Sequence, residues 1–187
     1  METKVIAFSG SLRKESYTTK LLKAFQKSAP VGITVEIIDI STLPFINEDL
    51  EADLPQPVKD LHAKIKSADA VIFATPEYNR SYSPVLKNAI DWGSRPEGNN
   101  LWKTKPATII GCSPYSLGAF GAVNHLRQVV LYVNLYIMQQ PEFYLSFIAD
   151  SMDEQGNITK KETQDFINGH WKAFGEWIEK FNSTKNN

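Results

Sequence analysis

The chain has 187 residues, which is enough for one domain with a substantial apolar core, and we expect that domain to span residues 1–187. Hydrophobic residues make up 42% and charged residues 22%, and the formal net charge is −1. This balance excludes the basic surface of a nucleic-acid or anionic-membrane binder. No segment reaches the roughly 18 apolar residues of a membrane span, and the N-terminal apolar run is too short for a signal peptide. We therefore expect a cytoplasmic protein without membrane insertion.

The cysteine and histidine content argues against a metal site. The single cysteine, Cys112, excludes an internal disulfide framework and a cysteine-rich metal site. We interpret Cys112 as a small buried residue in preference to a redox group. The three histidines lie on separate helical patterns without HExxH spacing, so no metal ligands are expected.

In the first half of the chain, short apolar runs alternate with helical patterns. The expected elements are a strand over 4–8, a helix over 18–29, a strand over 33–40 and a helix that has Pro57 in its first turn. The segment 44–57 contains too many prolines and acidic residues to form one element.

The second half continues the alternation. The expected elements are a strand over 70–74, a helix over 83–92, a strand over 107–112, a helix over 122–133, a fifth strand over 135–138, an extended stretch over 143–148 and a last helix. Thr159 and Glu162 form a capping-box pattern at the start of that last helix. Apolar strands separated by helices predict a doubly wound, three-layer α/β/α domain around a parallel sheet. In such sheets a ligand binds beyond the carboxyl ends of the strands.

The first loop at this edge covers residues 9–16, between a strand and the start of a helix. Free backbone N–H groups and the helix dipole favour an anion there. Serine hydroxyls add donors, and Arg13 can add a charge-assisted contact. In the other interpretation the loop is simply solvated and Ser16 caps the helix. The patterns of a nucleotide triphosphatase, a dinucleotide-binding loop and a cysteine phosphatase are absent, which leaves a phosphate monoester open.

The second loop covers residues 75–81 and is stiffened by Pro76. Backbone amides of residues 77–79 can bind the edge of a planar heterocycle, and Tyr78 or Tyr82 offers an aromatic face. The alternative is a rigid turn that carries exposed aromatic side chains.

The third loop, residues 113–121, carries Gly118 and Gly121. Glycine permits a close approach of the backbone to a ligand. It also suits a turn that merely ends a strand, so this loop is weak evidence by itself.

Two stretches carry a resemblance to a known family. GSLRKES is similar to the GSLR-x-x-S phosphate loop, and TPEYNRSYSPVLKNAIDWGSRP is similar to the PEYN-x-S and LKNAIDW signature, of the NADPH-dependent FMN reductase family. HLRQVV, QQPEF and AFGEWIEKF extend the resemblance along the whole chain, most to the quinone reductase, chromate reductase and azoreductase branch.

The resemblance implies a flavodoxin-like fold with a five-stranded parallel sheet, bound FMN, and NADPH or NADH as co-substrate. The implied cofactor-binding residues are Ser9, Ser11, Leu12, Arg13, Ser16, Thr18, Pro76, Glu77, Tyr78, Asn79, Arg80, Ser81, Ser113 and Gly118. Among these, Ser11, Arg13 and Ser16 carry over as phosphate ligands, and residues 77–79 as neighbours of the flavin ring, mainly through their backbone. No catalytic side chain is implied, because the flavin carries the chemistry.

Four positions depart from the family pattern. Thr18 stands where an asparagine is common, which weakens one phosphate contact, and Ala119 and Phe120 interrupt a loop that is usually richer in glycine. Arg80 occupies a variable position, where it would favour an anionic substrate or the 2′-phosphate of NADPH.

The expected reaction is hydride transfer from NAD(P)H to the flavin, followed by electron transfer to an acceptor in a ping-pong cycle. Candidate acceptors are quinones, azo compounds, chromate, ferric chelates and free flavin. The alternative is a flavodoxin-like electron carrier that binds FMN without reacting with NAD(P)H, and a third possibility is a flavin-free interaction domain.

We also expect self-association as a homodimer or homotetramer. The helix over 83–92 and the residues after it resemble the family's subunit-packing helix, and tryptophan and arginine are enriched in interface cores. The expected interface residues are Leu86, Ile90, Trp92 and Arg95, with Arg127 and Glu142 as further interface partners.

Overall fold

The computed structural model describes residues 2–182. Its strands are β1 (Thr3–Ser9), β2 (Ile33–Ile38), β3 (Ala70–Thr75), β4 (Pro106–Cys112), β5 (Tyr136–Ile137) and β6 (Phe143–Leu145). Its α-helices are α1 (Tyr17–Lys27), α2 (Gln56–Ser67), α3 (Pro84–Gly93), α4 (Phe120–Tyr132) and α5 (Lys161–Asn182). Two short 3₁₀-helices, η1 (Glu48–Asp53) and η2 (Ile148–Ser151), lie in the connections.

All strands pair in parallel, in the order β2-β1-β3-β4-β5, and β6 also pairs with β4. The order reverses between β1 and β3, because the chain first adds a strand on one side of β1 and then continues on the other. A doubly wound sheet of this kind has its ligand crevice at the carboxyl ends of the strands on either side of the reversal. The predicted flavodoxin-like α/β fold is therefore confirmed.

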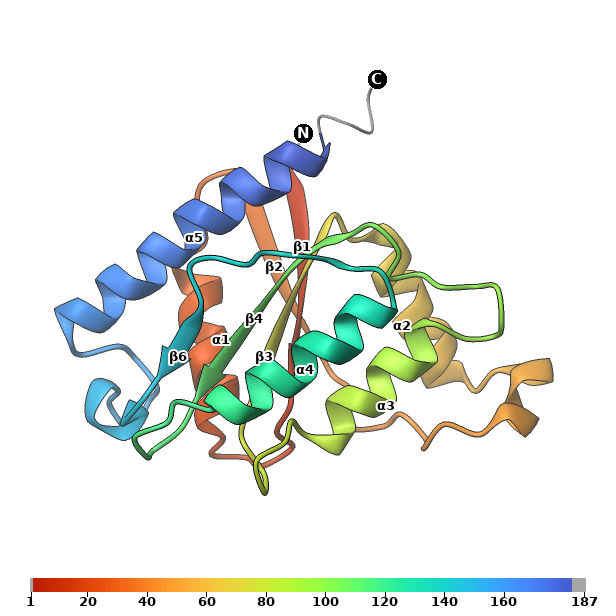
Figure 1. Ribbon diagram of the computed structural model, residues 1–187, viewed down its shortest axis with the longest axis horizontal. Helices are drawn as coiled ribbons and strands as arrows, with labels where there is room; N and C mark the ends of the chain where they lie inside the picture. The colour runs from red at the N-terminus through yellow and green to blue at the C-terminus, as the bar shows by residue number, and fades with distance from the viewer. Residues whose placement is uncertain (1, 183–187) are drawn as a thin grey trace.

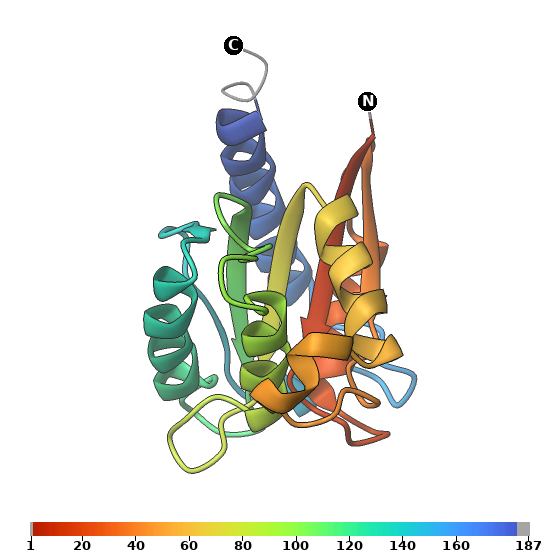
Figure 2. The same cartoon turned by 90° about the vertical axis from the view of Figure 1, so that its right-hand side faces the viewer.

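Helices cover both faces of the sheet. Figure 2 shows α2, α3 and α4 in front of the sheet and α5 behind it. In β1, Ile6 and Phe8 join the core under α2, α3 and α4, whereas Val5 and Ala7 join the core under α1 and α5. Because both faces of the strand are buried, it reads as a continuous apolar run with no alternation.

Three details differ from the sequence-based expectation. The fifth strand expected over 135–138 is the shorter β5, and the extended stretch expected over 143–148 contains the short strand β6; Pro141 between them has no N–H to offer a neighbouring strand. Strand β2 ends at Ile38, two residues earlier than expected. The segment 44–57, for which no single element was expected, contains the short 3₁₀-helix η1.

The predicted capping box at the last helix is wrong by one residue. Helix α5 begins at Lys161, and its first backbone hydrogen bond runs from the Gln164 amide to the Lys160 carbonyl, at 3.1 Å. The Thr159 amide instead donates to the Ser151 carbonyl, at 3.0 Å. Thr159 therefore belongs to the turn that precedes the helix.

Candidate functional site

The three loops named above follow β1, β3 and β4, which are neighbours in the sheet, and they lie together at the lower edge of Figure 1. The Gly10 amide donates to the Ala74 carbonyl at 2.8 Å. A Cβ at Gly10 would lie 2.8 Å from Pro76 Cδ and 2.9 Å from Leu86 Cδ1, closer than real side chains approach. Only glycine at position 10 lets the first loop contact the second. The signal for this contact in the sequence is a glycine placed directly after a strand.

The first loop leaves donors free at the start of α1. Ser16 caps the helix, and its hydroxyl accepts a hydrogen bond from the Thr19 amide at 3.3 Å. The amides of Tyr17 and Thr18, in the first helical turn, have no hydrogen-bond acceptor within residues 2–182. Free N–H groups at a helix N-terminus form a site for an anion such as a phosphate. The helix-cap interpretation of Ser16 is therefore correct and compatible with anion binding.

Side chains around this loop differ in exposure. Arg13 is exposed, and its guanidinium carbon lies 5.7 Å from the centre of the Tyr17 ring. Ser9 and Ser11 are nearly buried, with Ser9 Oγ 2.8 Å from Thr19 Oγ1 and 3.3 Å from the Ser11 amide. An exposed cation thus lies beside serine hydroxyls that are held by hydrogen bonds.

Thr18 faces the core. Its side chain is buried, and Cys112 Sγ lies 3.9 Å from its hydroxyl. Burial raises the pKa of Cys112 to about 12, so the thiol stays protonated at neutral pH. Cys112 is a buried residue, as predicted, and only the backbone amide of Thr18 is left for a phosphate.

The second loop contains a two-residue turn. Tyr78 and Ser81 exchange backbone hydrogen bonds of 2.9 and 3.0 Å. Between them Asn79 and Arg80 have φ angles of 50° and 67°, the pattern of a type I′ turn. Because the Tyr78 amide is bonded to Ser81, the amides available to a ligand are those of Glu77 and Asn79. The expectation of free amides throughout 77–79 is corrected in this respect.

The second loop is also tied to α4. Ser81 Oγ lies 2.9 Å from His125 Nδ1, and the Tyr82 ring packs edge-on against the His125 ring, at 5.0 Å between centroids. The Glu77 carboxylate accepts a hydrogen bond from the Ala122 amide at 3.2 Å and pairs with Arg80 at 3.2 Å. Sequence reasoning missed these ties, because α4 begins some 40 residues further along the chain than Glu77.

The third loop packs on β6. The Ser113 amide donates to the Leu145 carbonyl at 3.0 Å, and Ser113 Oγ accepts from the Tyr115 amide at 3.1 Å. Gly118 has a φ of 55°, and a Cβ there would lie 2.9 Å from the backbone carbon of Tyr144. The fold therefore requires glycine at position 118 for packing, whether or not a ligand binds there.

Two cavities open at these loops. One of about 370 Å³ lies between the second and third loops and is lined by Glu77, Asn79, Arg80, Ser113, Tyr115, Ser116, Leu117 and Ala119. The other, of about 330 Å³, lies beside the first loop and is lined by Ser9, Ser11, Leu12, Arg13, Thr19 and residues 37–41. Neither cavity is lined by the remaining predicted site residues, which are Ser16, Thr18, Pro76, Tyr78, Ser81 and Gly118.

Exposed apolar side chains gather at the three loops: Leu12, Tyr78, Tyr115, Leu117 and Phe120. The Phe120 ring also contacts the Tyr144 ring, with centroids 5.2 Å apart. Aromatic and aliphatic side chains beside a few polar groups suit a planar ligand. Sequence reasoning missed Tyr115, Ser116 and Leu117 individually, although it had singled out their loop.

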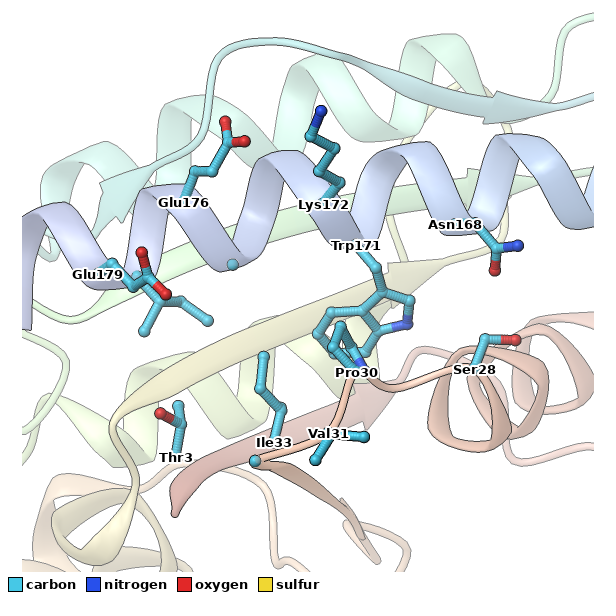
Figure 3. A pocket seen from close by; sticks show the side chains of 13 residues that line it. Thr3, Ser28, Pro30, Val31, Ile33, Asn168, Trp171, Lys172, Glu176 and Glu179 are labelled. Carbon is cyan, nitrogen blue, oxygen red and sulfur yellow. The ribbon is translucent and has the colours of Figure 1, made fainter. Parts of the chain in front are cut away.

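A further groove lies at the opposite edge of the sheet. It has a volume of about 660 Å³ and runs between α5 and the loop before β2 (Figure 3). Trp171 lines it, but its Nε1 already donates to the Phe25 carbonyl at 2.9 Å. Within residues 2–182, no three His, Cys, Asp or Glu side chains come together as metal ligands, and no helix there is long and apolar enough to span a membrane.

The expected interface residues of α3 lie in the core. Leu86, Ile90 and Trp92 are fully buried, and Trp92 Nε1 donates to the Pro44 carbonyl at 2.8 Å. The prediction that they face a neighbouring subunit is wrong, because the apolar face of α3 packs on the sheet and on the segment before η1. Arg95 pairs with Glu48 at 2.8 Å. Arg127 and Glu142 lie 3.6 Å apart within the same chain.

Comparisons with known proteins agree with one another. A sequence model described as NADPH-dependent FMN reductase matches residues 3–150. The chain is 41% identical over 171 residues to a quinone reductase of Pseudomonas putida, which covers 91% of each chain. It is 42% identical over 172 residues to an NADPH:quinone oxidoreductase of Arabidopsis thaliana, covering 87% of this chain and 85% of that one.

A solved structure is similar over nearly the whole length. It is FerB, a flavoenzyme NAD(P)H:(acceptor) oxidoreductase from Paracoccus denitrificans, with 43% identity and a TM-score of 0.91. The match covers 96% of this chain and 98% of that chain.

Proposed function

The chain belongs to the NADPH-dependent FMN reductase family, and from that premise we propose that it is a quinone reductase in which NAD(P)H and the acceptor take turns at one site. Its cofactors are FMN and NAD(P)H, in keeping with the family. A cytoplasmic location stays a prediction.

The first loop fits the phosphate of FMN. The free amides of Tyr17 and Thr18 and the exposed Arg13 supply positive charge and donors to a dianionic group. Ser9 and Ser11 add hydroxyls at the rim of the adjoining cavity. The single observation that carries the proposal is this free helix N-terminus, joined through the Gly10–Pro76 contact to a cavity lined by Tyr115 and Leu117 beside polar groups.

The chain's own residues have a positioning task. Bound FMN accepts a hydride from NAD(P)H and passes electrons to the acceptor. Glu77 and Asn79 offer free amides beside the cavity, and such donors stabilise negative charge that develops on a bound ring. Tyr115 and Leu117 line the same cavity and exclude water from a planar substrate.

Rapid mixing tests the activity. FMN-loaded protein mixed anaerobically with NADPH should lose its flavin absorbance within one turnover time and regain it on addition of a benzoquinone. Initial velocities measured against both substrates should give parallel double-reciprocal lines. A flavin spectrum that NADPH leaves unchanged would instead support the electron carrier, and protein that binds no FMN would support a flavin-free interaction domain.

The acceptor range is part of the proposal. We expect quinones to be reduced fastest, because Tyr115 and Leu117 in the cavity lining offer apolar contacts to a ring. Azo compounds, chromate, ferric chelates and free flavin remain candidate acceptors. Steady-state rates with each acceptor, using both NADPH and NADH, would rank them.

Self-association as a dimer or tetramer also remains a proposal. Its support is a groove of about 910 Å³ between α3 and α4 that carries the exposed Tyr132 together with Lys87 and Asp91. The Leu86 and Trp92 side chains of α3 are buried in the core and therefore do not support the proposed self-association.

A further inference from the structure

We propose that Glu77 is a positioning residue, which sets the spacing between the second and third loops by capping helix α4 from the other side of the cavity. This inference rests on the proposed function, since the cavity between these loops is where the flavin ring and the planar substrate would lie. It concerns the side chain of Glu77, whereas the resemblance to the family implies a role mainly for its backbone.

Helix α4 lacks a cap of its own. Its N-cap residue is Ala119, in the left-handed region with φ of 66°, and alanine has no side-chain oxygen to accept from the amides of the first helical turn. An N-cap side chain normally accepts from the second or third amide of the helix. Ala122 is the third residue of α4, and its amide donates to Glu77 Oε2 at 3.2 Å. Glu77 therefore takes the place of the missing cap.

The glycine at the second position of α4 makes room for this contact. A Cβ at Gly121 would lie 3.1 Å from Glu77 Oε2 and 3.3 Å from the Arg80 carbonyl. Only glycine lets the second loop come this close to the helix without a shift. The Glu77 side chain is 13% exposed, so its hydrogen bond is largely shielded from water.

Charge supports the same position. A carboxylate is favourable at a helix N-terminus, where the helix dipole is positive. The second oxygen of Glu77 pairs with Arg80, which is 74% exposed and has a strained φ of 67°. Because Arg80 is held by Glu77, both side chains stay at the cavity wall.

The tie joins two opposite walls of one cavity. Glu77 and Arg80 line it from the second loop, and Ala119 lines it from the third loop. Losing the carboxylate would leave the Ala122 amide uncapped and free the two loops to separate. We expect a looser cavity and weaker binding of a planar ligand, without any change to the phosphate-binding loop.

The test combines FMN titration with amide hydrogen exchange. Glu77→Ala should weaken FMN binding about fivefold to tenfold, the loss expected for a helix cap, and should speed exchange of the Ala122 amide. Glu77→Gln keeps an oxygen for the Ala122 amide and should restore both values to within about twofold of wild type. Gly121→Ala, which crowds the carboxylate without removing it, should shift both values in the direction of Glu77→Ala.

Controls separate this role from a general loss of stability. Glu36→Ala removes a carboxylate of β2, away from the cavity, that pairs with Lys4 of β1 and Lys64 of α2. This variant should leave FMN affinity and Ala122 exchange unchanged. Unchanged affinity and exchange in Glu77→Ala, or a Glu77→Gln variant as weak as Glu77→Ala, would overturn the inference. Wild-type protein that binds no FMN would sink the proposed function instead, and Ala122 exchange in the flavin-free protein would still test the tie.

Discussion

At the scale of single residues, Arg13 is the side chain on which we expect phosphate binding to depend most. It is exposed at the rim of the first loop, while the neighbouring serines are held by hydrogen bonds among themselves. Because the backbone amides of α1 are fixed by the fold, the guanidinium is the part of this site that a substitution can remove cleanly.

We expect Arg13→Ala to weaken FMN binding by about 1.5 to 3 kcal/mol, the value of a charge-assisted hydrogen bond. Quenching of FMN fluorescence during titration measures the affinity. Lys14→Ala, which removes an exposed neighbouring charge outside both cavity linings, should have little effect. If Arg13→Ala binds FMN as tightly as wild type, the assignment of the first loop to the phosphate is wrong.

Local patterns made part of the site predictable. Residues 9–16 follow an apolar strand and precede a helix, so their place at the ligand edge follows from spacing alone. The orientation of Thr18 toward Cys112 and the tie between Glu77 and α4 could not be read, because each depends on a contact between distant parts of the chain. The three core residues of α3 were assigned to an interface because their segment resembles the family's subunit-packing helix. Sequence could not correct this, since an apolar helix face looks the same whether a sheet or a subunit covers it.

At the scale of elements, the strength of each prediction followed the number of residues that carry the pattern. The long runs of β1, β3 and β4 are buried on both faces and were found with nearly correct bounds. The fifth strand and the extended stretch after it are shorter than expected, since the two residues of β5 and the three of β6 are too few to show a period. The start of α5 was misplaced because Thr159 and Glu162 have capping-box spacing but the chain turns one residue later.

Replacing a helical glycine by alanine should raise the stability of the protein at one position and lower it at another. A Cβ at Gly169 of α5 meets nothing within 4 Å, so Gly169→Ala should stabilise the protein by about 0.8 to 1 kcal/mol through helix propensity. At Gly93, the last residue of α3, a Cβ would lie 2.3 Å from the Trp102 ring, so Gly93→Ala should destabilise it. Urea denaturation measures both, and a loss of stability in Gly169→Ala would contradict the argument.

At the scale of the whole molecule, the buried histidine of α5 links stability to pH. His170 is 1% exposed among aromatic rings, with Nε2 2.9 Å from Thr108 Oγ1. Its Nδ1 is buried and has no hydrogen-bond partner in the described part of the chain. Burial, and then the positive charge of Arg127, lower the pKa of His170 from 6.5 to about 4.

Stability should therefore fall as the pH is lowered from about 6.5 toward 4, because the unfolded chain binds a proton that the folded chain does not. The total loss from this group is about 3 kcal/mol, at about 1.4 kcal/mol per pH unit. The free energy of unfolding, measured by urea denaturation at several pH values, checks this. His170→Phe should flatten the slope in that range, and an equal slope in both proteins would argue against His170 as the cause.

The interrupted strand beside β4 has a consequence for behaviour at high concentration. An exposed sheet edge is a template on which another chain can add a strand, and short or charged edge strands prevent this. On one side the edge is broken into β5 and β6, which offer an incoming chain no continuous row of N–H and C=O groups. On the other side β2 carries Glu36 in its middle, engaged by Lys4 and Lys64. Both edges are thus protected against amyloid-like stacking, and the helical faces are left as the surfaces on which ordered assembly can occur.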